Sequence, residues 1–451
     1  MTGGIFVKIK KLISAVLFGS LILSFSSGCN ITDFSADNLL RPPKAVGDEA
    51  EIEQLIAKTA DSGYTLKYPK SGRFRSAIIM IDLDGDENDE AVAFFRNSTE
   101  TSSVHMLVMY SKDDSWKIAS DNVFETTDID SVDFADITGN GKSEIIVNST
   151  TYTPNVGKLF CYSYSGGKTG EIGSEQSCSS FVTGDFDNDG TSEIMSLVLY
   201  TTENEALASM LDYNEDSKSL YAKAMANMDP NVVKYKNIAV TKLENDITGV
   251  VVDGTSASEI TNTQVIFYSR DLAILRNPLF KEKTKNITQR SSSIICSDID
   301  KDGKIEIPIT FDLPKQKDDT KNIYADKIIW NSFDTVKESL VKKQAVIINY
   351  DYMFMMNYPD NWENKVTAIT NLKNGTTSFY AWNGTKLDTE LFEIKVFPVS
   401  EWESGKSDDF TLITKDDKYA YTFNNINPDT QVSLSDDEIK TGFMTLAQSG
   451  I

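Results

Sequence analysis

The nine residues Asp185-Phe186-Asp187-Asn188-Asp189-Gly190-Thr191-Ser192-Glu193 place carboxylates at positions 1, 3, 5 and 9 of a short loop. Oxygen ligands at this spacing can surround a hard cation such as Ca2+, which takes six to eight of them. Glycine at position 6 lets the chain turn back, so that the carbonyl at position 7 can join the ligand set. The stretch therefore predicts a cation-binding loop.

The same pattern occurs in three other places. We call these stretches loop 1 (Asp82–Glu90), loop 2 (Asp136–Glu144) and loop 4 (Asp298–Glu306), with loop 3 being Asp185–Glu193. Loop 1 departs from the pattern, because Glu87 stands at position 6 and Gly85 two residues earlier. The predicted ligands are Asp82, Asp84, Asp86 and Glu90; Asp136, Thr138, Asn140 and Glu144; Asp185, Asp187, Asp189 and Glu193; and Asp298, Asp300, Asp302 and Glu306.

A simpler explanation for each loop is that Asp, Asn and Gly form good hairpin turns. Four loops with one ligand spacing favour the cation, which relieves the repulsion among clustered carboxylates. EF-hands are excluded, because they need flanking helices and a bidentate Glu at position 12. The four loops have Ala93, Val147, Ser196 and Ile309 at that position.

The spacing of the loops predicts a repeat architecture. The apolar residues at position 2 are Leu83, Ile137, Phe186 and Ile299, and the last gap is about twice the others. A degenerate fifth unit around Leu243, with Lys242 in place of the first ligand, fills that gap and gives intervals of 54, 49, 57 and 56 residues. Short apolar runs bounded by turn residues read as strands. The sequence therefore predicts a mainly β fold, a β-propeller of about five to six blades.

These loops resemble the calcium-loop repeats of the FG-GAP or VCBS family of β-propellers, over roughly residues 70–310. The family's Phe-Gly signature is mostly missing here. The resemblance implies that the sixteen residues bind Ca2+ at up to four sites, and that the sites stabilise the fold and are not catalytic.

The N-terminus predicts export. Residues 1–28 combine Lys8, Lys10 and Lys11 with the apolar run Leu12 to Phe25, as in a signal peptide. Small residues before Cys29 resemble a bacterial lipobox, although Ser26 stands where Leu is usual, so Cys29 is the expected lipidation site. Ordinary cleavage nearby, or an uncleaved anchor, are the alternatives. The expected location is the extracytoplasmic face of the cell membrane, held through the N-terminal lipid only.

The rest of the chain divides by composition. Residues 29–63 are expected to form a tether and a short helix, residues 64–345 the propeller, and residues 346–451 a small α+β domain. Within the last part, Ser435 and Glu438 form a capping box that opens a helix.

Charge limits the partners. The 451-residue chain has a net charge of -23, which argues against nucleic acid and anionic lipid surfaces. An envelope protein or a glycan is the expected partner. Beyond Cys29, Cys161 and Cys178 could pair or be buried thiols, and Cys296 looks like a core residue.

No catalytic constellation is recognisable. His105, the one histidine, lies in a strand-like context without an obvious acid partner in the sequence. We therefore expect a noncatalytic surface lipoprotein that binds a ligand at the cell envelope. The alternatives are a polysaccharide-active lyase or hydrolase on a propeller, and an envelope assembly scaffold.

Overall fold

The computed structural model describes residues 47–60, 63–151, 155–173, 176–291, 294–317, 319–405 and 409–449. Contacts divide the chain into two units, Met1–Gln54 and Leu55–Ile451. Helix α3 (Asp48–Ala60) confirms the expected short helix. The predicted signal peptide and Cys29 lie outside the described residues. Among the helices that are described, none has the length and apolar character needed to cross a membrane.

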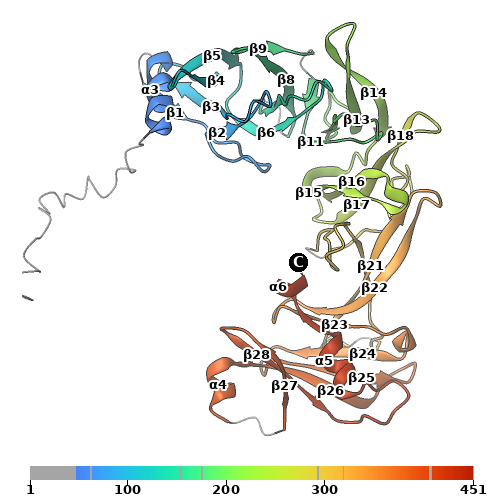
Figure 1. Ribbon diagram of the computed structural model, residues 1–451. Helices are drawn as coiled ribbons and strands as arrows, with labels where there is room; N and C mark the ends of the chain where they lie inside the picture. The colour runs from blue at the N-terminus through green and yellow to red at the C-terminus, as the bar shows by residue number, and fades with distance from the viewer. Residues whose placement is uncertain are drawn as a thin grey trace, which may run out of the picture. The chain divides into compact units, whose positions relative to one another are not determined.

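The second unit is mainly β, as predicted, and consists of antiparallel sheets that follow one another along the chain (Figure 1). Sheet 1 has the order β1-β3-β4-β5 with β2 also on β3, and sheet 2 has β10-β8-β7-β6 with β9 also on β8. The strands are β1 (Tyr64–Leu66), β2 (Ile78–Ile81), β3 (Glu90–Asn97), β4 (Val104–Lys112), β5 (Ser115–Phe124), β6 (Ile129–Ala135), β7 (Glu144–Ser149), β8 (Gly157–Ser165), β9 (Lys168–Glu171) and β10 (Gln176–Cys178).

Sheets 3 and 4 are four-stranded meanders, with the orders β11-β12-β13-β14 and β15-β16-β17-β18. Their strands are β11 (Ser180–Gly184), β12 (Glu193–Val198), β13 (Leu207–Asn214), β14 (Ser219–Asn227), β15 (Val232–Lys242), β16 (Thr248–Ser256), β17 (Thr261–Ser269) and β18 (Ile274–Arg276). A 3-10 turn, η1 (Glu244–Asp246), joins β15 to β16.

Sheet 5 has the order β19-β21-β22-β23-β29, and sheet 6 has β20-β24-β25-β26-β28-β27. Their strands are β19 (Ile307–Asp312), β20 (Ile323–Tyr324), β21 (Asp326–Asp334), β22 (Ser339–Asn349), β23 (Phe354–Asn357), β24 (Val366–Asn371), β25 (Thr376–Trp382), β26 (Leu387–Pro398), β27 (Thr411–Lys415), β28 (Tyr419–Asn425) and β29 (Phe443–Thr445). The remaining helices are η2 (Asp360–Trp362), α4 (Val399–Glu403), α5 (Asp436–Gly442) and α6 (Leu446–Ser449). Ser435 caps α5 with the predicted capping box.

The predicted boundary between residues 345 and 346 needs correction, because it falls inside strand β22. This strand pairs with β21 before the boundary and with β23 after it. The C-terminal β29 then returns to pair with β23. Sheets 5 and 6 also share one apolar core, which includes Ile347, Phe354, Phe379 and Phe392.

Apolar clusters join successive sheets, and the residue at position 2 of loops 1, 2 and 3 belongs to one of them, whereas Ile299 of loop 4 packs with strands of sheet 5. Leu83 packs with residues of sheets 1 and 2, Ile137 with sheets 2 and 3, and Phe186 with sheets 3 and 4. Leu243 packs with sheets 4 and 5. In loops 1, 2 and 3 the residue at position 2 therefore anchors its loop beside the seam between two sheets.

Candidate metal centres

Loops 2 and 3 each connect the first strand of a sheet to the second, and loop 1 connects β2 to β3 in sheet 1. Glu at position 9 is the first residue of its strand, where it pairs with the residue before the first Asp: Ile81 with Glu90, Ala135 with Glu144, and Gly184 with Glu193. In loop 4 the same pairing is a single bridge between Ser297 and Glu306. The predicted strand-loop-strand unit is therefore present in all four places.

The fifth unit has the same topology but a shorter loop. Lys242 pairs with Thr248, so five residues separate the paired positions instead of the eight between Ile81 and Glu90. Lys242 thus pairs across the strands as Ile81 does, while the next residue, Leu243, packs between two sheets as the position 2 residues do. Its ammonium group donates to the Thr248 hydroxyl at 2.7 Å.

Hydrogen bonds within each loop hold the first and last carboxylates in place. In loop 3, Asp185 accepts from the backbone N–H groups of Asp189 and Gly190 at 3.1 Å each, and Glu193 Oε2 accepts from the Phe186 N–H at 2.8 Å. The other loops repeat this bond from position 2 to position 9, at 2.8 to 3.0 Å.

The four loops, including loop 1, also share one backbone feature. Positions 4 and 6 have positive φ in each: Gly85 and Glu87, Gly139 and Gly141, Asn188 and Gly190, Lys301 and Gly303. Glu87, with a φ of 69°, therefore takes the conformation that glycine supplies elsewhere.

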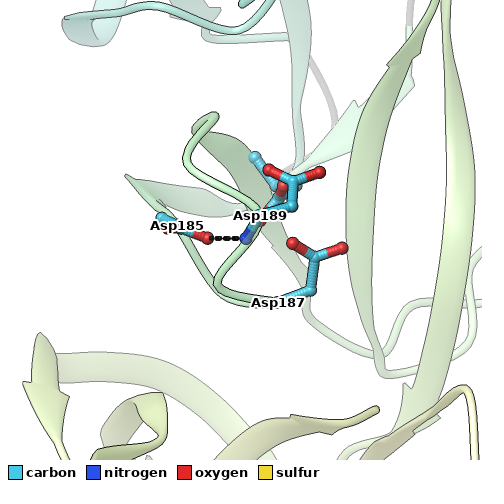
Figure 2. A group of neighbouring side chains, drawn as sticks. Asp185, Asp187 and Asp189 are labelled. Atoms are coloured by element: carbon cyan, nitrogen blue, oxygen red, sulfur yellow. Dashed lines mark hydrogen bonds between the residues drawn. The ribbon is translucent and has the colours of Figure 1, made fainter.

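Loop 3 brings all four of its predicted ligands together. Carboxylate oxygens of Asp185, Asp187, Asp189 and Glu193 lie within 4.8 Å of one another, and Figure 2 shows the three aspartates gathered around the loop. Glu193 is fully buried and Asp187 is 8% exposed. Glu193 Oε1 and Asp187 Oδ1 accept no hydrogen bond from the described residues. Buried polar oxygens normally have a partner, so these two atoms fit a bound cation.

Loops 1 and 4 bring together their three aspartates, Asp82, Asp84 and Asp86 in one and Asp298, Asp300 and Asp302 in the other. Their glutamates, Glu90 and Glu306, are not part of these groups within the same distance. Glu306 is nevertheless fully buried, and its Oε1 has no partner among the described residues. Asp84 Oδ1 is unpartnered in the same way.

Loop 2 differs, because its polar groups satisfy one another. The Thr138 hydroxyl donates to Glu144 Oε1 at 3.1 Å, while the N–H groups of Ile137 and Thr138 donate to Oε2. Asp136 and Asn140 accept only from backbone N–H groups of the loop. Of the four predicted sites, this one has the weakest structural support.

Burial and mutual repulsion disturb the ionisation of the position 9 glutamates. Burial raises the pKa of Glu193 to about 8, with further upward effects from Asp187 and Asp189. Burial likewise raises the pKa of Glu90 and of Glu306 to about 7. The pKa of Glu144 is also raised, chiefly by burial. A divalent cation would stabilise the ionised form of each group.

Lysine side chains approach three of the loops, which the sequence did not suggest. The Lys223 ammonium group contacts Asp187 Oδ2 and lies 2.8 Å from Asp212 Oδ2. Lys142 lies 3.9 Å from Asp84, and Lys343 lies 3.6 Å from Asp302. Each ammonium group offsets part of the negative charge of its loop, and other carboxylate oxygens of the loop remain available to a cation.

His105 has partners that sequence analysis missed. Its Nδ1 lies 2.9 Å from Asp121 Oδ1 and its Nε2 lies 3.0 Å from Glu100 Oε2. The imidazole is 9% exposed and stacks on Phe95. Asp121 is on the neighbouring strand β5 and Glu100 is in the β3–β4 loop, so no local motif links the three residues.

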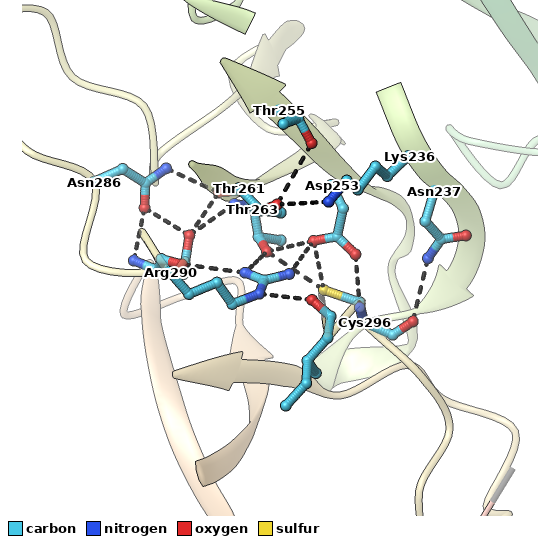
Figure 3. Close-up of polar contacts among 11 residues, drawn as sticks. Lys236, Asn237, Asp253, Thr255, Thr261, Thr263, Asn286, Arg290 and Cys296 are labelled. Atoms are coloured by element: carbon cyan, nitrogen blue, oxygen red, sulfur yellow. Dashed lines mark hydrogen bonds and ion pairs between the residues drawn. The ribbon is translucent and has the colours of Figure 1, made fainter. Parts of the chain in front are cut away.

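A second polar cluster lies at the junction of sheets 4 and 5 (Figure 3). Asp253 and Arg290 form an ion pair at 2.7 Å, and both side chains are fully buried. Asp253 also accepts from the Cys296 N–H at 2.6 Å and from the Thr263 hydroxyl at 2.6 Å.

Cys296 is buried, as predicted, and Cys161 and Cys178 are free buried thiols rather than a disulfide.

No known protein family's sequence profile and no curated protein matches this chain. Solved structures do match. The periplasmic gluconolactonase of Pseudomonas aeruginosa is 9% identical, with 73% of this chain and 88% of that one covered and a TM-score of 0.33. Sqt1 of Saccharomyces cerevisiae is 12% identical, with 76% and 86% covered and a TM-score of 0.32. An exo-beta-1,3-galactanase of Phanerochaete chrysosporium is 11% identical, with 74% and 79% covered and a TM-score of 0.29.

The gluconolactonase and the galactanase are enzymes, and this corrects the expectation of a protein without catalytic activity. The absence of a recognisable catalytic motif in the sequence is therefore no evidence that the protein lacks catalytic activity. At these TM-scores the likeness assigns neither reaction to this chain.

Proposed function

We propose that this protein is a calcium-stabilised β-propeller of the FG-GAP or VCBS type that binds a protein or glycan ligand at the cell envelope. The repeated sheets would be its blades, each entered through the same strand-loop-strand connection. The lipid on Cys29 would hold the protein at the extracytoplasmic face of the membrane. Its strongly negative charge makes nucleic acid an unsuitable ligand.

The observation that supports calcium best is the pair of buried oxygens in loop 3. Asp187 Oδ1 and Glu193 Oε1 lack partners beside Asp185 and Asp189, and burying charged oxygens without compensation is unfavourable. Carboxylates are the ligands that Ca2+ prefers. Loops 1 and 4 share the positive φ at positions 4 and 6 and would form further sites, whereas loop 2 would be the weakest.

Contacts between the loops also suggest how a cation would stabilise neighbouring sheets. The Ser143 N–H in loop 2 donates to the Leu83 carbonyl in loop 1 at 2.9 Å, and the Ser192 N–H in loop 3 donates to the Asp136 carbonyl in loop 2 at 3.0 Å. A cation that orders one loop therefore also orders the contact with its neighbour. Calcium would act on the seams between blades.

The test is thermal unfolding of the protein with excess chelator, with calcium and with magnesium. Calcium should raise the melting temperature above that of the chelated protein, and magnesium should do so less, because it demands a stricter octahedral geometry. At about 100 times Kd, each filled site adds about 2.7 kcal/mol. Equal melting temperatures in all three conditions would contradict the proposal.

The anchor and the ligand need separate tests. Cys29→Ser should abolish incorporation of labelled fatty acid and release the protein from the membrane fraction. Ligands should be sought with glycans and surface proteins on the calcium-loaded protein, and bound glycans should be analysed for cleavage products, so that any hydrolase or lyase activity is detected.

A further inference from the structure

A cavity of about 560 Å3 lies where the first strands of sheets 2, 3 and 4 begin. Asp130 and Ser131 of β6, Ser180 of β11 and Tyr235 of β15 line it. Asn155, in the β7–β8 connection, donates to the Val233 carbonyl of β15 at 3.3 Å and so links sheets 2 and 4 beside the cavity. Sites for small ligands have volumes of about 300–1,000 Å3, so the cavity has the size of a binding site.

The chemistry of the lining is unusual for a ligand pocket. Five serines, two threonines and three asparagines make up ten of its twenty-two residues, whereas most small-molecule pockets are lined chiefly by apolar side chains. Hydroxyl and amide groups both donate and accept hydrogen bonds. The buried Ser131 hydroxyl has no partner among the described residues. This lining suits a ligand that itself carries many hydroxyl groups.

Backbone irregularities coincide with the cavity. In β6 the pairing with β7 skips Asp130, between Ile129 and Ser131. In β15 the pairing with β16 skips Val233 and Lys236. All three skipped residues line the cavity, while the parts of β6 and β15 beyond it pair regularly. Bulges redirect side chains and are frequent beside functional sites. Bulges can also keep an exposed edge strand from pairing with another chain, but that role would not confine them to the end of the strands beside the cavity.

The charges of the lining also fit a polyhydroxylated ligand. Asp130 is the one carboxylate among the lining residues, and Lys234 and Lys236 are the two cations. A carboxylate accepts and ammonium groups donate hydrogen bonds to hydroxyls. The net charge of -23 opposes polyanions. Tyr235 and Phe181 add apolar ring atoms to the lining.

We propose that this cavity binds a sugar unit of a neutral glycan. The inference rests on the proposed function, because it assigns a site and a ligand class to the expected binding activity. The site is separate from the cation loops: Ser131 of β6 is five residues before Asp136, and Ser180 of β11 is five residues before Asp185, and five residues of extended chain span roughly 16 Å. Calcium would therefore stabilise the site without contacting the sugar.

The experiment is calorimetric titration of the full-length, calcium-loaded protein with neutral hexasaccharides of glucose, mannose, galactose and xylose, and with polygalacturonate as an acidic counterpart. The wild type should bind at least one neutral hexasaccharide more tightly than polygalacturonate. Ser180→Trp, which fills the cavity, and Tyr235→Ala, which removes a ring, should each weaken that binding at least tenfold. Tyr221→Ala, on the outer strand β14, is the matched control and should bind like the wild type.

Two results would overturn the proposal. If a cavity variant with an unchanged melting temperature binds the hexasaccharide as the wild type does, the site is wrong, although ligand binding itself stands. If no neutral hexasaccharide binds, or only polygalacturonate does, the ligand class is wrong. The proposed function would then fail as well only if the surface-protein screen also finds no partner. Two cavity variants are used so that one folded variant is enough for the comparison.

Discussion

Glu193 is the residue at which cation binding can be tested most directly. Its Oε2 is held by the Phe186 N–H, its Oε1 is buried without a partner, and its pKa is raised to about 8 by burial. Glu193→Gln keeps the size of the side chain and the accepted hydrogen bond but removes the charge. We expect the variant to lose one calcium site, or about 2.7 kcal/mol of calcium-dependent stability at 100 times Kd. Calorimetric titration and melting with calcium would measure both.

Glu144→Gln in loop 2 is the matched control for that substitution. Because Glu144 Oε1 already accepts from Thr138, the change should alter calcium stoichiometry less. If the two variants bind calcium alike and both match the wild type, the position 9 glutamates are not ligands.

The Asp253–Arg290 pair allows a second test at single residues. Arg290→Met would leave Asp253 charged and fully buried, which typically costs about 3–5 kcal/mol. Adding Asp253→Asn should restore much of that loss, because no uncompensated charge remains. Urea unfolding of the two single variants and the double variant gives the comparison. A double variant that is as unstable as the sum of the single ones would contradict a coupled pair.

At the scale of elements, local sequence patterns predicted local structure. The strand-loop-strand units, helix α3 and the capping box of α5 each depend on residues within about ten positions, and each was found. Interactions between distant residues were missed. Asp253 and Arg290 are 37 residues apart, and His105 meets Asp121 only because β4 pairs with β5.

At the candidate metal centres, too, local patterns were predicted and contacts between distant residues were missed. The sequence identified all four loops by the spacing of their predicted ligands. It did not reveal that the Thr138 hydroxyl donates to Glu144 or that Lys223 reaches Asp187. It also did not reveal that the loop after Lys242 is shorter than the other loops, because strand register and not residue type fixes where a loop begins and ends. The bulged strands at the cavity leave no pattern in the sequence, since register is a property of two strands together.

Loop backbone geometry makes a prediction of its own. Gly190 has a φ of 95°, and a Cβ there would meet no atom within 4 Å, so Gly190→Ala tests backbone strain alone. The left-handed conformation costs an alanine about 1–2 kcal/mol. We expect a loss of that size in stability and weaker calcium binding in loop 3. Gly170→Ala in β9, where φ is not positive, should lower calcium affinity little; equal effects on calcium binding would contradict the geometric role of Gly190.

At the scale of the whole molecule, similar loops follow one another along a chain with a large negative charge. Loops 1, 2 and 3 contact one another directly through backbone hydrogen bonds. Their carboxylates therefore repel within and between loops. The stability of the cation-free protein should depend on how many of these groups are ionised.

The raised pKa values of the position 9 glutamates decide whether the stability of the cation-free protein rises or falls with pH. The pKa of Glu193 is about 8 and those of Glu90 and Glu306 are about 7, against 4.5 ordinarily, so the folded state holds protons that the unfolded state has lost. Their contribution to stability is full below about pH 4.5 and is lost as pH rises to about 8. Calcium would bind the ionised groups, so the gap in melting temperature between calcium-loaded and chelated protein should widen across this window. Replacing all three glutamates with glutamine should flatten the gap, and a wild-type gap that is constant with pH would show that these groups do not bind the cation.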